Sequence, residues 1–254
     1  MSVQLLLLAL LSVSVKGQEW IQLAGAGSAM HSVHANSQFL WGIDTNNIAQ
    51  YCKRPCSSKW EYRTHNIRNL DVGTDFTYFA SFDYKLYRGT AKESNYDVAN
   101  EDVDTIDVAA GGNGYIWLLD ADNNIRKWST SLESVDSSID GRFINIAANS
   151  EYVFGIDFSN TINYRPIFGG KGPWETIPGQ FKCMTAGARE IFAVGFNNTL
   201  MFRCTIPCIG NWEKMESPAS NVVQLDATVD ALFAVTSAGI IYRHELPLAS
   251  YYNN

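Results

Sequence analysis

The sequence predicts an all-β protein: a six-bladed β-propeller of four-stranded antiparallel blades, with the ring closed by the N-terminal strand. The first observation is an aromatic residue that recurs at intervals of 38, 38, 37, 38 and 41 residues, at Trp41, Phe79, Trp117, Phe154, Phe192 and Phe233. The second is that the residues around each aromatic alternate or are β-branched, with Gly, Asn, Asp and Ser between the runs. The third is the size of the unit, since about 38 residues is the length of one propeller blade.

Each unit contains three strand-like runs. The first run is apolar, ends in small residues, and lies at 29–35, 66–73, 105–111, 143–149, 181–187 and 222–228. The second run holds the recurring aromatic. The third run ends in an aromatic residue, in most units followed by Arg, and lies at 48–51, 86–88, 125–128, 162–165, 200–203 and 240–243. These runs predict three strands in every blade.

A fourth run begins with Trp in four units, at Trp20, Trp60, Trp174 and Trp212. In units two and three it has no Trp, and we place it at Tyr96 and around Val135. The chain opens with a Trp run, whereas the last unit lacks one. We therefore expect residues 20–23 to pair with residues 240–243, which closes the ring and removes an exposed sheet edge.

The residue directly after the recurring aromatic is small in five units, and the five are Gly42, Ala80, Gly155, Ala193 and Ala234. Leu118 departs from this pattern. Because successive residues of a strand face opposite sides, each blade presents a bulky knob on one face and a recess on the other. Close packing of neighbouring blades explains this pattern without any function.

The first 17 residues are expected to be a secretory signal peptide. The apolar run from Val3 to Val15 is too short to span a bilayer and ends in small residues before Gln18. We therefore expect a secreted protein whose residues 18–254 form a single propeller domain. Without Lys16 the chain carries 18 basic and 26 acidic residues, a net charge of 18 − 26 = −8. This balance argues against nucleic acid or an anionic membrane surface as the main partner.

Four of the five cysteines form two pairs in the same frame. Cys52 and Cys56 precede Trp60, and Cys204 and Cys208 precede Trp212, with the Trp eight residues after the first Cys in both units. In an exported chain this pattern favours two local disulfides over a zinc site. The remaining Cys183 lies in an apolar run and is expected to be a buried free thiol.

The sequence holds no catalytic constellation. The four histidines fall in unrelated frames, no nucleophile, zinc or phosphate-loop motif is present, and the acidic residues at 101–104 are expected to be a solvated loop. We therefore predict neither an enzyme nor a cofactor or metal, with calcium left open because no sequence signal bears on it.

Two readings of the recurring polar and aromatic residues stay open. Asn- and Asp-rich segments at 44–47, 120–124 and 157–160 suit either hairpin turns or sugar hydroxyls. Arginines that follow the third-run aromatic, and the outer Trp residues, suit either blade packing or a ligand. The candidate ligand residues are Trp20, Trp60, Trp174, Trp212, Arg165, Arg203, Arg243, Asp44 and Asn47. A single glycosylation sequon begins at Asn197.

The segments 174–179, 181–187, 191–195 and 202–203 together resemble a tectonin repeat, and Trp212, Trp60 and Trp20 begin weaker copies. With six units, the mature chain resembles the tectonin-repeat lectins, the family of the fish-egg lectins and tachylectin-1. The resemblance implies a six-bladed propeller that binds N-acetylglucosamine-type glycans and bacterial lipopolysaccharide in egg or innate defence. Units two and three lack the leading Trp, so the resemblance implies poorer sites there.

We therefore predict a secreted multivalent lectin whose partners are glycans and bacterial surface polysaccharide, with self-association left open. The alternative is a secreted propeller that acts as a protein–protein interaction platform. Fold alone does not decide between the two, because propellers carry many functions.

Overall fold

The computed structural model describes residues 19–23, 28–57, 59–90, 96–111, 114–137, 139–168, 172–196 and 201–247. The expected signal peptide at 1–17 and the sequon at Asn197 lie outside these residues. Within the described ranges the regular structure consists of β-strands, and no helix there is long and apolar enough to cross a membrane.

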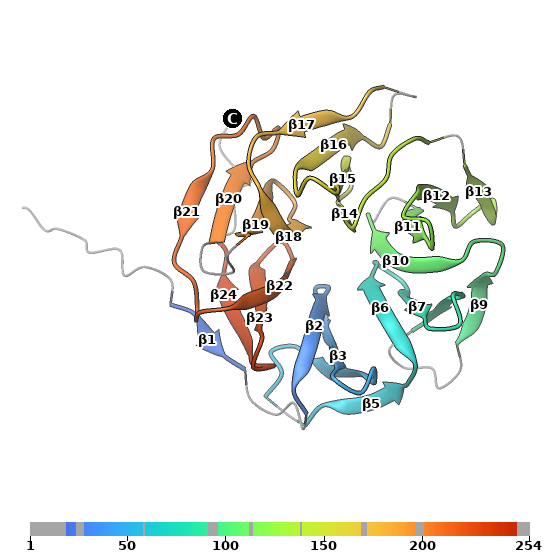
Figure 1. Cartoon of the computed structure of the whole chain (residues 1–254). Helices are drawn as coiled ribbons and strands as arrows, with labels where there is room; N and C mark the ends of the chain where they lie inside the picture. Colours follow the sequence, from blue (N-terminus) through green and yellow to red (C-terminus); the bar gives the residue numbers. More distant parts are fainter. Residues whose placement is uncertain are drawn as a thin grey trace, which may run out of the picture.

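Six four-stranded antiparallel sheets are arranged as the blades of a ring, which confirms the predicted fold (Figure 1). The innermost strands are β2 (Met30–Ala35), β6 (Ile67–Val72), β10 (Thr105–Ala110), β14 (Asn145–Ala148), β18 (Phe181–Ala186) and β22 (Val222–Ala227). The second strands are β3 (Phe39–Asp44), β7 (Thr77–Ser81), β11 (Tyr115–Asp120), β15 (Tyr152–Ile156), β19 (Glu190–Gly195) and β23 (Ala231–Thr236). Blades 1 to 6 are numbered in this order.

The third strands are β4 (Ala49–Lys53), β8 (Leu86–Gly89), β12 (Ile125–Ser129), β16 (Ile162–Pro166), β20 (Met201–Thr205) and β24 (Ile241–Glu245). The outer strands are β5 (Glu61–Thr64), β9 (Asp97–Asn100), β13 (Ser134–Asp136), β17 (Glu175–Ile177), β21 (Glu213–Met215) and β1 (Ile21–Gln22). The hydrophobic core is divided into six clusters, and each lies between two adjacent blades. Apolar side chains therefore fill the space between adjacent blades.

The N-terminal strand closes the ring. Strand β1 pairs antiparallel with β24, with Ile21 opposite Arg243 and Gln22 opposite Tyr242, and the Leu23 N–H donates to the Ile241 carbonyl at 2.9 Å. The pairing predicted from the spare Trp run is thus confirmed. Blade 6 is built from both ends of the chain.

Replacing Leu23 by Pro is expected to lower the free energy of unfolding by about 1–3 kcal/mol more than Leu23→Ala does, because Pro removes the N–H that bonds to Ile241. Urea denaturation of both variants measures this difference. Equal midpoints would show that this end of the strand does not help to hold the ring closed.

The register of the strands corrects the repeat alignment in blade 2. In blades 1 and 3 the aromatic knob is Trp41, opposite His34, and Trp117, opposite Ala109. The same position in blade 2 is Tyr78, opposite Asp71, so Phe79 occupies the recess position. The assignment of Phe79 as the knob and Ala80 as the small residue was therefore wrong by one residue. Spacing alone did not show this, because Tyr78 and Phe79 are both aromatic.

With the corrected register, the size of the recess residue depends on whether the outer strand of the same blade begins with Trp. The recess residue is small in the four blades with an outer Trp, where it is Gly42, Gly155, Ala193 or Ala234. In the two blades without a Trp it is Phe79 or Leu118. A large residue in the recess fills the inner part of the volume that the outer Trp helps to fill elsewhere, next to the innermost strand.

The glycines show how tight this space is. A Cβ atom built on Gly42 would lie 2.9 Å from the Met30 sulfur and 3.2 Å from the Trp60 ring. A Cβ atom on Gly155 would overlap the Phe143 ring. These glycines are therefore required by close approach of a neighbouring side chain rather than by their backbone conformation.

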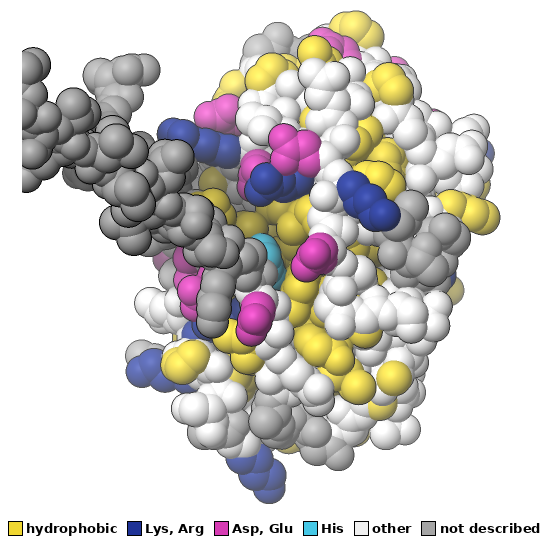
Figure 2. Space-filling model, turned by 90° about the vertical axis from the view of Figure 1, so that its left-hand side faces the viewer, with side chains coloured by type: hydrophobic (Ala, Val, Ile, Leu, Met, Phe, Trp, Pro, Cys, Tyr) yellow, Lys and Arg dark blue, Asp and Glu magenta, His cyan; other side chains and the backbone are white. Residues whose placement is uncertain are grey.

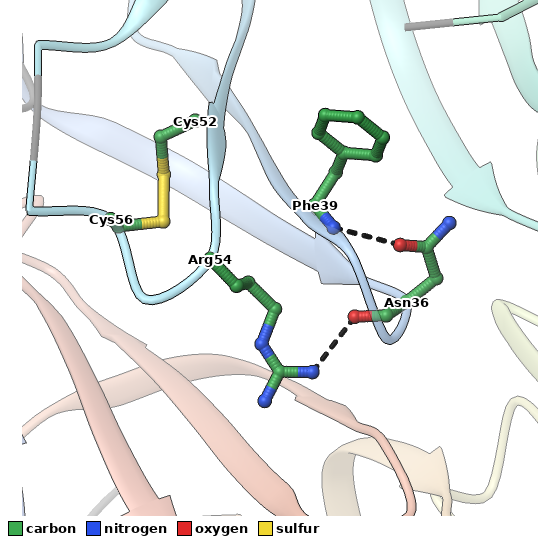
Figure 3. The surroundings of a disulfide bond; sticks show 5 residues. All are labelled: Asn36, Phe39, Cys52, Arg54 and Cys56. Atoms are coloured by element: carbon green, nitrogen blue, oxygen red, sulfur yellow. Dashed lines mark hydrogen bonds between the residues drawn. A yellow bond between two sulfur atoms is a disulfide. The ribbon is translucent and has the colours of Figure 1, made fainter.

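Both cysteine pairs form local disulfides, Cys52–Cys56 and Cys204–Cys208, at S–S distances of 2.03 and 2.10 Å. The first disulfide encloses Arg54, whose guanidinium donates to the Asn36 carbonyl at 2.8 Å (Figure 3). The same guanidinium forms a 2.8 Å ion pair with Asp230 of blade 6. This loop therefore helps to join the first blade to the last.

Cys183 lies on β18 and is a buried free thiol, in the environment expected from its apolar run. Burial raises the pKa of this thiol to about 12, so it stays protonated and unreactive at neutral pH.

Candidate functional site

Three of the four outer Trp residues bridge adjacent blades. The indole N–H groups donate to backbone carbonyls of the preceding blade, from Trp174 to Asp140 at 2.6 Å, from Trp212 to Pro178 at 2.8 Å and from Trp20 to Glu216 at 2.9 Å. Each bond joins the outer parts of two neighbouring blades. The N–H of these residues therefore has a structural partner, and the ring face is the part left for a ligand.

The ring faces of these residues are partly covered. Trp174 contacts Phe143 at a centroid distance of 4.6 Å, Trp212 contacts Phe181 at 4.4 Å, and Trp20 contacts His244 at 5.0 Å. All three Trp residues are intermediate in exposure.

Trp60 differs from the other three, because only 4% of it is exposed and its ring covers Gly42. The prediction that Trp60 contacts a ligand is corrected to a packing role. The sequence did not distinguish it, since the exposure of an outer Trp depends on the neighbouring blade.

Arg203 and Arg243 share one position in their blades, opposite Phe192 and Phe233, and both form ion pairs. Arg203 lies 2.9 Å from Glu213 and 3.9 Å from Glu190. Arg243 lies 3.3 Å from Glu245. Both guanidinium groups remain partly exposed beside these carboxylates.

Arg165 does not share this position. It pairs opposite Val153, one residue further along its strand, so its side chain faces the other side of the blade. It is only 4% exposed, lies 3.7 Å from Asp140, and has its guanidinium 5.6 Å from the centre of the Trp174 ring. Arg165 therefore supports Trp174 from within the protein, which corrects its prediction as a ligand contact.

The Asp- and Asn-rich segments are hairpin turns. One carboxylate oxygen of Asp44 accepts the N–H groups of Asn46 at 2.8 Å and Ile48 at 3.0 Å, and the other accepts the Ser28 hydroxyl at 2.8 Å. Asn47 has a φ of 60°, the left-handed conformation that Asn tolerates in turns. Asp120 and Asp157 cap their turns in the same way.

Asp44 is also buried, with 2% of its surface exposed. The structure therefore gives Asp44 a turn-forming role, which corrects its prediction as a ligand contact. Asn47 is intermediate in exposure, and its contact with a ligand stays a prediction.

A polar belt surrounds a central cavity of about 370 Å³. It consists of the inward-facing residues Ser32, Asn69, Asp107, Asn145, Cys183 and Gln224, together with His34, Asp71, Thr185 and Asp226. In five of the six innermost strands the pairing register shifts directly before the belt residue, which is Ser32, Asn69, Asp107, Cys183 or Gln224. A polar residue at the same place in five of six apolar runs was the sequence signal that could have revealed this belt.

The belt joins neighbouring innermost strands. Asp71 accepts the Ala110 N–H of the next blade at 2.7 Å, Asp107 accepts the Ile146 N–H at 3.3 Å, and Gln224 accepts the Val33 N–H at 2.9 Å. These strands belong to different sheets, so their buried amides need side-chain acceptors. Among the described residues, no cluster of His, Cys, Asp and Glu is arranged to hold a metal.

Burial raises the pKa of Asp71 to about 6, that of Asp107 to about 7, and that of Asp226 well above its usual value. Burial likewise lowers the pKa of His34 to about 3. Loss of water contacts penalises the charged form of each group.

A second cavity, of about 480 Å³, lies at the junction of blades 1 and 2, and we call it the blade 1–2 cavity. Its walls are formed by Thr64, His65, Asn66, Ile67, Phe79, Ser81, Asp83, Tyr87 and Tyr96. None of these residues was a predicted ligand contact. The outer-strand residue here is Tyr96, where four other blades have Trp.

The edge of the ring formed by β1, β20, β21 and β24 faces the viewer in Figure 2. Hydrophobic side chains extend along this part of the surface, with acidic and basic side chains beside them (Figure 2). The junction of blades 5 and 6, which contains Trp20 and Arg243, belongs to this edge.

No protein-family model matches the chain, and no curated protein matches it in sequence. Its fold matches solved propellers. The WD40 β-propeller domain of Doa1 aligns with a TM-score of 0.58 at 10% identity, over 93% of this chain and 99% of that domain. The structure of YCF48 bound to D1 peptide aligns with a TM-score of 0.60 at 13% identity, over 94% of this chain and 99% of that chain. At these identities the likeness concerns the fold alone.

Proposed function

We propose that the protein is a secreted multivalent lectin that binds glycans where its blades meet. The observation that carries this proposal is a partly exposed indole repeated at three consecutive junctions, those of Trp174, Trp212 and Trp20. Arg165 lies beside the Trp174 ring, and Arg203 and Arg243 pair opposite Glu213 and Ile21, the residues that follow Trp212 and Trp20. The resemblance to tectonin-repeat lectins and the expected signal peptide support the same function. No covalent step is part of it.

The chemistry of these positions suits a sugar. An indole face packs against the apolar C–H face of a pyranose, an arginine donates hydrogen bonds to the sugar hydroxyls, and the carboxylate paired with it accepts hydrogen bonds from them. The pairs Arg203–Glu213 and Arg243–Glu245 provide such groups in blades 5 and 6. In blade 4 the buried Arg165 lies beside the Trp174 ring instead.

Three weak sites on one rigid ring suit a repetitive surface such as a bacterial envelope. Linked binding raises avidity by roughly 10² to 10⁴ when several sites engage at once. We propose N-acetylglucosamine-type glycans and bacterial lipopolysaccharide as the ligands, as the family resemblance implies.

The second candidate is a protein-binding platform. It is favoured by exposed aromatic side chains on loops of blades 4 and 5, namely Phe158, Phe168 and Phe196, which are 59%, 60% and 64% exposed. Inhibition by free sugar separates the two candidates, because it blocks a lectin and leaves a protein-binding surface unaffected.

The expected result is agglutination of bacteria that free N-acetylglucosamine abolishes. Replacing Trp212 by Leu removes one indole and is expected to lower the agglutination titre about tenfold, since avidity depends on simultaneous engagement. Leu132→Ala, at an exposed apolar residue of blade 3, is the control and should leave the titre unchanged. A glycan array with no signal above background would exclude the proposed function, and thermal melts verify that each variant is folded.

A further inference from the structure

Blade 2 has no outer Trp, and the blade 1–2 cavity lies where the indole packs at other junctions. In blade 4 the indole contacts Phe143, two residues before the innermost strand, and in blade 5 it contacts Phe181, the first residue of that strand. The corresponding residue of blade 2 is Ile67, which instead lines the cavity. The missing indole therefore leaves space at this junction.

Tyr96 occupies the position of the Trp but packs differently. Its ring contacts Phe79 edge-on at a centroid distance of 4.6 Å and lies so close to Gly89 that a Cβ there would overlap it. Its hydroxyl is buried and has no hydrogen-bond partner among the described residues. Burial raises the pKa of Tyr96 to about 12, so this hydroxyl is a neutral donor at physiological pH.

The chain that leaves the outer strand of blade 1 also lines the cavity. At three other junctions a backbone carbonyl of the preceding blade accepts the indole N–H. The carbonyl belongs to a residue that follows the outer strand of that blade, and the three residues are Asp140, Pro178 and Glu216. The matching stretch of blade 1 is Thr64–His65, directly at the cavity wall. A ligand in the cavity would therefore lie beside backbone carbonyls whose counterparts at other junctions accept a hydrogen bond from an indole N–H.

Asp83, in the turn between β7 and β8, supplies a charged acceptor to the lining of the cavity. It accepts hydrogen bonds from the hydroxyls of Ser81 and of Tyr87, the latter at 3.1 Å. The Ser81 hydroxyl lowers the pKa of this carboxyl, so Asp83 is ionised at neutral pH. The two hydroxyls hold the carboxylate in place while it remains exposed to solvent.

These groups define the class of ligand. The partly exposed rings of Tyr87 and Tyr96 offer apolar surface, and the carboxylate, amide and hydroxyl groups around them offer several polar contacts. The nine described lining residues include no Lys or Arg, and the one carboxylate among them, Asp83, disfavours a phosphate, sulfate or carboxylate group beside it. The charges of Arg63 and Lys85 lie behind Tyr96 and Asp83, so a phosphorylated sugar is included in the test below. A bare aromatic side chain would leave most of the polar groups without partners.

We propose that the blade 1–2 cavity binds one neutral pyranose residue of a glycan, between the rings of Tyr87 and Tyr96 and the carboxylate of Asp83. This inference rests on the proposed lectin function. It assigns a binding site to blade 2, for which the family resemblance implied a poorer site because the outer Trp is missing. The loss of the indole creates this site.

The test is a site-resolved NMR titration of the secreted chain, labelled with ¹⁵N, with N-acetylglucosamine. We expect saturable shifts of the amides at 64–67 and 81–87. Tyr96→Trp should fill the cavity and abolish these shifts while those near Trp174 and Trp212 persist. Asp83→Asn, which preserves shape, should weaken binding at the cavity about tenfold, the usual effect of losing a charged hydrogen-bond acceptor. Leu132→Ala is the control.

The other outcomes separate this inference from the proposed function. Shifts confined to the Trp junctions would overturn the cavity site and leave the lectin proposal standing. The absence of shifts with every glycan tested would overturn both. Binding of N-acetyltryptophanamide but no sugar at 64–67 and 81–87 would overturn the inference in favour of an aromatic side chain from a protein partner. Glucose 6-phosphate that binds as tightly as N-acetylglucosamine would overturn the neutral class of ligand.

Discussion

Replacing Gly42 by Phe is expected to lower the free energy of unfolding by about 3 kcal/mol, because the new side chain has no room in the recess of blade 1. Its first carbon alone would lie 2.9 Å from the Met30 sulfur and 3.2 Å from the Trp60 ring. Trp60→Ala is expected to cost about 3–5 kcal/mol, since Trp60 is buried and its removal leaves a cavity.

Combining the two substitutions is expected to cost about 2 kcal/mol less than their sum. The Phe ring then takes space that the indole has vacated, as Phe79 fills the recess of blade 2 beside the smaller Tyr96. Urea denaturation of the two single variants and the double variant measures this coupling. Gly42→Phe combined with Trp174→Ala, in another blade, is the matched control and should be additive. Additivity in both pairs would refute the idea that recess and outer aromatic share one volume.

Asp107→Asn is expected to stabilise the protein at pH 8 by about 2–4 kcal/mol. Burial raises the pKa of Asp107 to about 7, whereas an unfolded Asp titrates near 3.8. Between these values the folded state binds a proton that the unfolded state lacks, so stability falls as pH rises. The full penalty is present above pH 7 and absent below about pH 4. An amide has nearly the same shape and carries no charge to bury. Its one oxygen keeps either the Val108 or the Ile146 N–H bonded, so the lost acceptor reduces the gain.

The difference between wild type and variant reports Asp107 together with its electrostatic interaction with Asp71, whose charge also raises the pKa of Asp107. Asp71 and Asp226 act in the same direction, because their pKa values are also raised. His34 opposes them: its pKa is lowered to about 3, so its contribution to stability grows as pH rises from about 3 to 6.5. Denaturation midpoints measured from pH 4 to 8 give the difference curve. A difference that does not depend on pH would show that Asp107 is ionised throughout.

The predictions that succeeded depend on periodic features of single strands. The outer strands of blades 2 and 3, at β9 and β13, were located without a Trp because the preceding runs fixed where a fourth strand must lie. Ring closure by Leu23 and its neighbours followed from the count of runs at the two ends. The placement of Phe79 failed because two adjacent aromatics satisfy the same spacing, and only pairing with Leu70 distinguishes them.

The candidate site was much less predictable. Trp20, Trp60, Trp174 and Trp212 are equivalent in sequence, yet Trp60 is buried whereas the other three are partly exposed. Asp44 proved to be a turn cap, because its carboxylate is directed into its own hairpin. The blade 1–2 cavity combines residues of two blades, and no run of sequence contains both walls.

The sequence by itself determined the number of blades, the strands within them, the closure of the ring and the local pairing of four cysteines. These features depend on alternation and spacing along one chain, where each residue's neighbours are known. The tertiary structure alone decided which aromatics are exposed, which carboxylates are buried around the centre, and where cavities lie. Exposure and burial depend on the distance between side chains of different blades. The indole of Trp60 packs against Gly42, whereas the smaller ring of Tyr96 leaves a cavity at the junction of blades 1 and 2.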